Sequence, residues 1–189
     1  KLRDKQSARM QQMIQTREAA YVFLDLERAA GPLDAEIIQV AAVSGHSRTI
    51  FNCYITPRGG IDPHCSTNSH KLSVHNGQLY KDDRIIEDAV SLDTCITRFI
   101  AFLREVKEFV GSLAITLVVY GETDRPNLLN SINSLNRLDK FTAVCPIFLN
   151  FNSVMRECEE ITDLTGGRTS LMKSNILQII TGQGPDLNQ

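Results

Sequence analysis

The stretch that decides the fold is Tyr21-Val22-Phe23-Leu24-Asp25-Leu26-Glu27, an apolar run that ends in two carboxylates. Side chains two residues apart in a β-strand lie on the same face, so Asp25 and Glu27 are expected to point at one spot where a sheet ends. A second apolar run, residues 115–120, is followed by Asp124. If the two runs are neighbouring strands, the three acids converge. This pattern predicts a metal-binding arrangement.

The length and composition of the 189-residue chain are those of one globular domain. Its formal net charge of −2 supplies no basic field for a polyanion, so nucleic-acid binding must depend on a local patch or on metal ions. No stretch reaches the roughly 18 apolar residues of a membrane span, and no signal-peptide pattern is present. The five cysteines have no CxxC spacing, which indicates free thiols in a reducing compartment. We therefore expect an intracellular protein, nuclear or cytoplasmic.

Residues 1–19 differ in composition from the rest of the chain. They are rich in Gln, Arg, Lys and Met, and their few apolar residues are spaced loosely like one face of a helix. We expect a helical N-terminal extension, and a helix that binds other protein domains is the alternative. Residues 20–189 are then expected to form one domain whose last helix lies beyond Gln189.

The apolar pattern of this domain predicts an α/β fold. Three strands are expected at 21–26, 36–43 and 49–56, joined by short connections as in an antiparallel meander. Residues 56–88 hold three of the four histidines and are expected to form a long surface loop. The remaining expected elements are a helix capped by Ser91, a strand at 114–120, a helix from Pro126, a strand at 146–151 and helices at 153–160 and 170–180. This order describes a mixed five-stranded sheet flanked by helices.

The position of the acids indicates their chemistry. Open α/β sheets bind ligands beyond the carboxyl ends of their strands, and Asp25, Glu27 and Asp124 lie at two such ends. Carboxylates gathered there repel one another unless divalent cations are bound, and oxygen ligands favour Mg²⁺ or Mn²⁺ over zinc. Two such ions would activate a water and stabilise the leaving oxygen of a phosphodiester. The acids therefore predict phosphodiester hydrolysis.

Four segments together resemble a known family: 23–27, 37–43, 74–77 and 124–130. They look like the DEDDh-type 3′-5′ exonucleases of the ribonuclease H-like superfamily, and the resemblance covers about residues 21–180. It is most specific in the Asp-x-Glu strand. It implies a ribonuclease H-like fold and a DNA or RNA strand with a 3′ end as the substrate.

The same resemblance implies roles for particular residues. Asp25, Glu27 and Asp124 match the first three metal-binding acids of the family. The substrate-binding positions carried over by the resemblance are Leu26, Arg28, His75 and Asn76.

The sequence departs from the family pattern at several positions. The family closes its site with a His general base and an Asp ligand, yet no His-x-x-x-x-Asp follows Asp124 and no histidine follows His75. Arg28 stands where a small hydroxyl residue is common, and Asp186 follows Gly-Pro in a loop rather than on a helix. Either the closing helix lies beyond Gln189, or the site is degenerate, as in the exonuclease-like domain of the promyelocytic leukaemia protein. The alternative function is thus a catalytically inactive protein or nucleic-acid interaction module, with Arg28 filling the former pocket.

Each signal also has a simpler interpretation. Asp25 and Glu27 are then a solvated strand end, and Asp124 is a helix N-cap. Glu122 could cap the helix, pair with Arg125 or join the acids. The histidines of the 56–88 loop fit no compact zinc spacing.

Overall fold

The computed structural model describes residues 19–30, 36–62, 71–120, 122–145 and 147–151. The chain divides into two compact units, Lys1–Leu149 and Asn150–Gln189. Of the described residues, only Asn150 and Phe151 belong to the second unit. Almost all of the expected N-terminal extension, and the helices expected at 153–160 and 170–180, lie outside the described residues.

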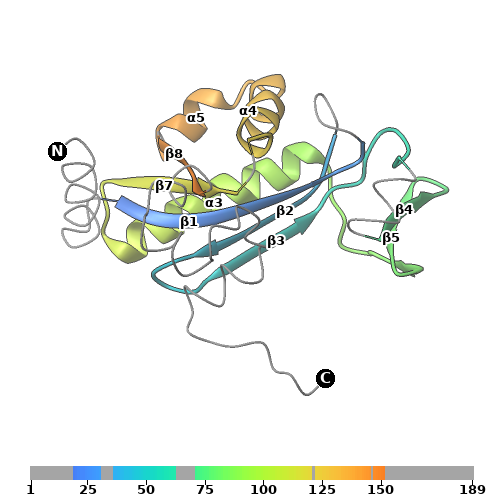
Figure 1. Ribbon diagram of the computed structural model, residues 1–189, viewed down its shortest axis with the longest axis horizontal. Helices are drawn as coiled ribbons and strands as arrows, with labels where there is room; N and C mark the ends of the chain where they lie inside the picture. Colours follow the sequence, from blue (N-terminus) through green and yellow to red (C-terminus); the bar gives the residue numbers. More distant parts are fainter. Residues whose placement is uncertain (1–18, 31–35, 63–70, 121, 146, 152–189) are drawn as a thin grey trace, which may run out of the picture. The chain divides into compact units, whose positions relative to one another are not determined.

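A mixed sheet with the strand order β3-β2-β1-β7-β8 organises the described part of the chain (Figure 1). Its strands are β1 (Ala19–Arg28), β2 (Ile37–Ser44), β3 (Ile50–Tyr54), β7 (Ala114–Val119) and β8 (Ile147–Asn150). β1, β2 and β3 form the expected antiparallel meander, and β7 runs parallel to β1. The α/β class and the five-stranded mixed sheet are therefore confirmed.

In the described part of the chain, three helices accompany this sheet: α3 (Leu92–Val110), α4 (Asp124–Ser134) and α5 (Leu138–Thr142). α3 begins at the predicted cap, where Ser91 Oγ accepts a hydrogen bond from the backbone N–H of Thr94 at 3.2 Å. It ends at Gly111, whose left-handed backbone (φ 66°) lets its N–H bond the carbonyl of Glu108. Among the described helices, none is long and apolar enough to span a membrane.

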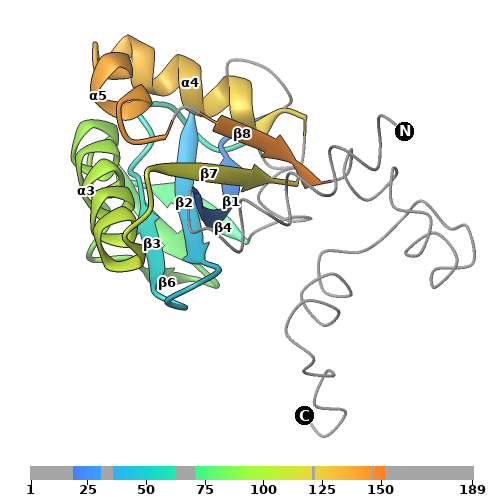
Figure 2. The ribbon, with the colours of Figure 1, turned by 90° about the vertical axis from the view of Figure 1, so that its left-hand side faces the viewer.

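The helices cover one face of the sheet, which Figure 2 shows on one side of the strands. β1 alternates between buried and half-buried side chains, so its even-numbered residues from Val22 to Leu26 enter the core. The helices contribute large, fully buried partners to the same core: Ile96, Phe99, Leu103, Leu128, Ile132 and Phe141. The alternation places Asp25 and Glu27 on the face opposite this core.

The prediction of one long loop over residues 56–88 is wrong for residues 72–85, which fold into a second, three-stranded sheet. This small sheet consists of β4 (Leu72–His75), β5 (Gln78–Lys81) and β6 (Arg84–Ile85). Asn76 (φ 53°) and Gly77 (φ 73°) form the two-residue turn between β4 and β5, the geometry that favours Asn-Gly in hairpins. The turn signal was therefore present in the sequence.

Gly77 supplies a direct test of this hairpin. Replacing it with Ala forces a Cβ into the left-handed region, although no atom lies within 4 Å of that Cβ. We expect the free energy of unfolding to fall by about 1 kcal/mol, measured by urea denaturation. Gly60→Ala is the matched control, because Gly60 also has open space around it and no positive φ. An equal loss in both variants would contradict the hairpin assignment.

Three cysteines, Cys53, Cys95 and Cys145, are buried free thiols, as predicted. Burial raises the pKa of Cys145 to about 12, so this thiol stays neutral. The neighbouring Cys95 thiol lowers the pKa of Cys53 below its ordinary value. Cys65 and Cys158 lie outside the described residues.

Candidate functional site

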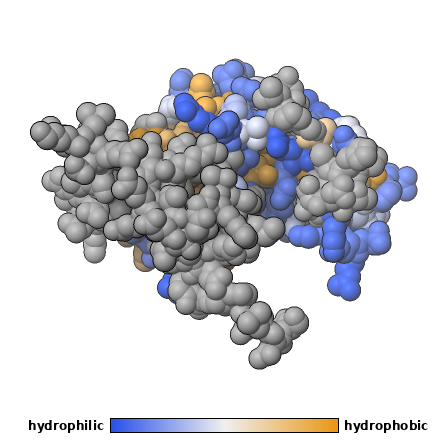
Figure 3. Space-filling model, viewed as in Figure 1, coloured by the Kyte–Doolittle hydropathy of each residue, from blue (hydrophilic) through white to orange (hydrophobic). Residues whose placement is uncertain are grey.

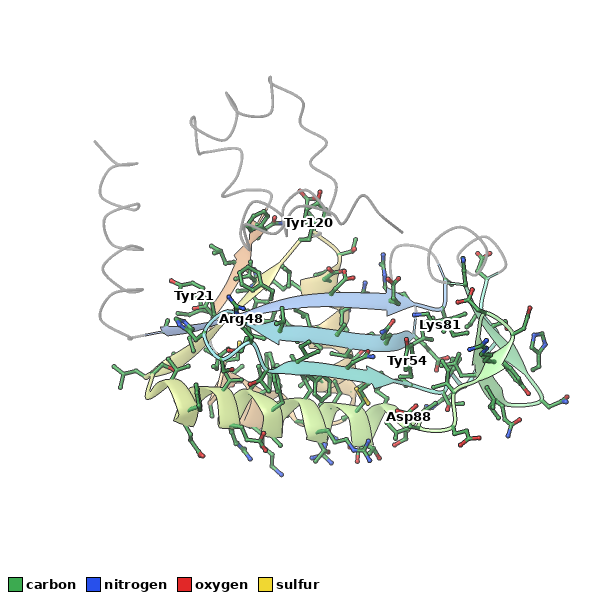
Figure 4. All side chains as sticks on the ribbon, turned by 90° about the horizontal axis from the view of Figure 1, so that it is seen from below. Tyr21, Arg48, Tyr54, Lys81, Asp88 and Tyr120 are labelled. Atoms are coloured by element: carbon green, nitrogen blue, oxygen red, sulfur yellow. The ribbon has the colours of Figure 1, made fainter. Side chains whose placement is uncertain are left out.

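The carboxyl ends of two neighbouring parallel strands form the candidate site. Leu24 of β1 lies opposite Val119 of β7 in the ladder, so the residues that follow them, Asp25 and Tyr120, lie at the same end of the sheet. Tyr120 is labelled in Figure 4. This is the edge where open α/β sheets bind their ligands.

Asp25 and Glu27 project from the same face of β1, as the i, i+2 spacing predicted. Both are half-buried. In the antiparallel ladder with β2, Asp25 lies opposite Ala41 and Glu27 lies opposite Gln39. The partner of Asp25 is thus a small apolar residue, and Gln39 places an amide side chain across from Glu27.

Asp124 is the first residue of α4 and is only 7% exposed. The N-cap position belongs to Thr123, so the interpretation of Asp124 as the cap is wrong. α4 thus begins two residues before the expected Pro126. The partial positive charge at a helix N-terminus stabilises a carboxylate there, which offsets part of the cost of burying Asp124. Arg125 stacks its guanidinium 5.5 Å from the ring centroid of Phe148 on β8.

Asn127 is a polar residue of this region that the sequence did not single out. It lies one helical turn after Asp124, on the same side of α4, and is 3% exposed. Its Nδ2 atom has no hydrogen-bond acceptor among the residues that the structure describes. An unsatisfied buried donor costs about 1–3 kcal/mol. The only signal in the sequence was the i, i+3 spacing from Asp124.

The acids supply the right donor type for a divalent cation, since hard cations prefer carboxylate oxygens. Asp25 and Glu27 share a face, and Asp124 begins the helix that follows the neighbouring strand. Within the described part of the chain, however, no three His, Cys, Asp or Glu side chains approach closely enough to hold a metal ion. The residues thus share a sheet end without a preformed three-ligand cage, and the metal site stays a prediction.

The implied substrate-binding residues lie in three different settings. Leu26 is buried in the core, on the face opposite Asp25, so only its backbone can face a substrate at the acids. Arg28 is half-buried and follows a β-bulge in the ladder with β2, and bulges commonly redirect side chains near active sites. His75 and Asn76 are exposed at the hairpin turn of the small sheet, with the His75 ring edge-on to Tyr80 at 5.4 Å.

Comparison with models of known protein families found no match for this chain, and comparison with curated proteins found none either. The resemblance to DEDDh-type exonucleases therefore stays a prediction, which depends on the quoted motifs. The parallel pairing of β1 with β7 is seen in the structure itself and does not depend on that resemblance.

Proposed function

We propose that this domain is a metal-dependent 3′-5′ exonuclease of the ribonuclease H-like superfamily, hydrolysing phosphodiester bonds at the 3′ ends of DNA or RNA. The observation that supports this best is the parallel register of β1 and β7. It brings Asp25 to the sheet end from which the chain continues to Asp124. The mixed five-stranded sheet is compatible with the proposed fold.

The three acids would bind metal ions from two elements, β1 and α4. Asp25 and Glu27 would hold Mg²⁺ or Mn²⁺ from one face of β1, and Asp124, on a helix that packs against the opposite face, would reach the ions past the end of β7. When bound there, such ions would supply an activated water and would stabilise the leaving oxygen of the phosphodiester. The N-terminus of α4 favours the ionised, ligating form of Asp124. Since no histidine follows His75, the family's general base has no counterpart after Asp124 in this sequence.

A second candidate is a non-catalytic interaction module with the same fold. Two observations favour it. The described residues form no three-ligand metal group, and Arg28 directly follows the Asp-x-Glu pair. A guanidinium beside two carboxylates would balance their charge in place of a cation. On this alternative, the domain binds a strand or a protein without cleaving a phosphodiester.

The two candidates differ in one measurement: the release of mononucleotides from a single strand labelled at its 3′ end. We expect release in Mn²⁺ and none in EDTA. A strand carrying the label at its 5′ end should shorten progressively under the same conditions. Binding of the strand without release of labelled nucleotide in Mn²⁺ would contradict the exonuclease and favour the module.

A further inference from the structure

A row of polar side chains starts at Glu27 and crosses the sheet on the same face as the acids. Glu27 lies opposite Gln39 in β2, and Gln39 lies opposite Tyr54 in β3. Residues directly opposite one another in antiparallel strands share a face. The adjacent row ends in Asn52, whose Oδ1 accepts a hydrogen bond of 2.7 Å from Gln39 Nε2. The polar surface is therefore continuous from β1 to β3.

The small sheet adds a cation to the far end of this row. Lys81, the last residue of β5, donates a hydrogen bond from Nζ to Tyr54 Oη at 3.1 Å. The same ammonium lies 5.7 Å from the centroid of the Tyr54 ring. Figure 4 labels both residues and shows them near the ends of β2 and β3 that face the small sheet. Tyr54 thus orients an exposed lysine beside the row.

A surface cavity of about 510 Å³ adjoins the same lysine. It is lined by Lys81, Asp82, Arg84, Ile85 and Ile86. Asp82 lies 3.5 Å from the ammonium of Lys71, which balances its charge, and Asp83 is exposed in the same turn. Two cations, Lys81 and Arg84, therefore line one cavity, in a part of the molecule with many hydrophilic residues (Figure 3).

We propose that Tyr54 and Lys81 bind the single strand upstream of its 3′ end, with a phosphodiester of the strand on the Lys81 ammonium. This inference rests on the proposed function, because it takes the 3′ end to lie at Asp25 and Glu27. Strands in a sheet are about 4.8 Å apart, so the row from β1 to β3 spans about 10 Å. That span corresponds to roughly three stacked nucleotides at 3.4 Å each.

The chemistry of the row favours a nucleic-acid strand over a protein segment. Single-strand binding combines cations that follow the phosphates with aromatic rings and polar groups that tolerate any base. Lys81, Tyr54 and Gln39 provide these three kinds of group. Because the net charge of the chain is −2, a strand needs such a local cation near the acids.

The test measures binding in EDTA, where no hydrolysis occurs. A fluorescent 12-nucleotide single strand is titrated with the wild-type chain and with Lys81→Ala at several salt concentrations. We expect Lys81→Ala to weaken binding about tenfold, the effect of losing one charge-assisted hydrogen bond, for strands of any sequence. The slope of log K against log salt should fall by about 0.7, the value for one phosphate contact on a single strand.

Lys140→Ala is the matched control, since Lys140 is exposed on α5, which packs on the opposite face of the sheet. It should leave both the affinity and the salt slope unchanged. Lys81→Arg should retain the slope, and Tyr54→Phe should weaken binding two- to threefold because the lysine loses its hydroxyl partner.

Two results would overturn the inference: no binding of the strand by the wild-type chain, or equal slopes for wild type and Lys81→Ala. Nucleotide release in Mn²⁺ is read separately. If release persists while Lys81→Ala binds like wild type, only the strand path is wrong. If Lys81→Ala changes the slope but the wild type releases no nucleotide, the path is supported and the exonuclease is contradicted.

Discussion

Replacing Asp25 with Asn is expected to reduce Mn²⁺-dependent nucleotide release by at least about a hundredfold. The substitution keeps the shape of a half-buried side chain on β1 but removes the charge that would hold the cation. Metal ions contribute several kcal/mol of transition-state stabilisation, and each 1.36 kcal/mol corresponds to a factor of ten in rate. Glu27→Gln should act in the same direction, because Glu27 shares the face.

Metal binding can be measured independently of the reaction. A ligand at 100 times its dissociation constant stabilises the folded state by about 2.7 kcal/mol, so Mn²⁺ should raise the melting temperature of the wild-type chain. Asp25→Asn should abolish that increase. Asp139→Asn, an exposed acid on α5, is the matched control and should change neither quantity. Full activity in Asp25→Asn would rule out the proposed metal site.

The presence of most strands and helices could be predicted from short stretches of sequence, because periodicity and capping depend on residues close together in the chain. In β1, buried and half-buried side chains alternate because one face of the strand lies in the core. In β7, the apolar run is continuous because both faces of the strand are buried. Ser91 capped α3 as predicted, since its side chain bonds a backbone N–H only three residues away. The prediction that Asp25 and Glu27 share a face was also correct, because it depends only on their i, i+2 spacing in one strand.

The features that could not be predicted from the sequence depend on contacts between distant segments. The row from Glu27 through Gln39 and Tyr54 to Lys81 exists only because two ladders and one hydrogen bond fix the register, and a slip of one residue would turn each side chain to the other face. The small sheet was missed for a different reason. Its strands have four residues or fewer, so the Asn76-Gly77 turn was their clearest sign.

The burial of Asp124 and Asn127 also required the structure. A polar residue in the first turn of a helix is ordinarily exposed or capping, and the sequence offered no reason to place these two in the interior. α4 carries Leu128 and Ile132 into the core, and this orientation takes Asp124 and Asn127 inward with them. Asp124 and Asn127 are therefore buried because of which side of α4 faces the core, and not because of their own polarity.

Phe99→Ala is expected to produce the largest loss of stability among these predictions. Phe99 is fully buried on α3, and its ring centroid lies 5.3 Å from that of Phe51 on β3 and 6.4 Å from that of Phe102. Truncation leaves a cavity between helix and sheet, which for buried phenylalanines costs about 3–5 kcal/mol. Since domains of this size are stable by about 5–15 kcal/mol, the midpoint of urea unfolding should fall sharply.

A matched control exists on the same helix. Phe109 is 76% exposed, so Phe109→Ala removes the same atoms without opening a cavity and should change stability by less than about 0.5 kcal/mol. If Phe99→Ala does not fold at all, Phe99→Leu provides a milder test, with an expected loss of about 1 kcal/mol. Similar urea midpoints for Phe99→Leu, Phe109→Ala and the wild type would mean that α3 does not pack on the sheet through Phe99. Since α3 also packs on β1, that result would remove the support for the position of Asp25 and Glu27.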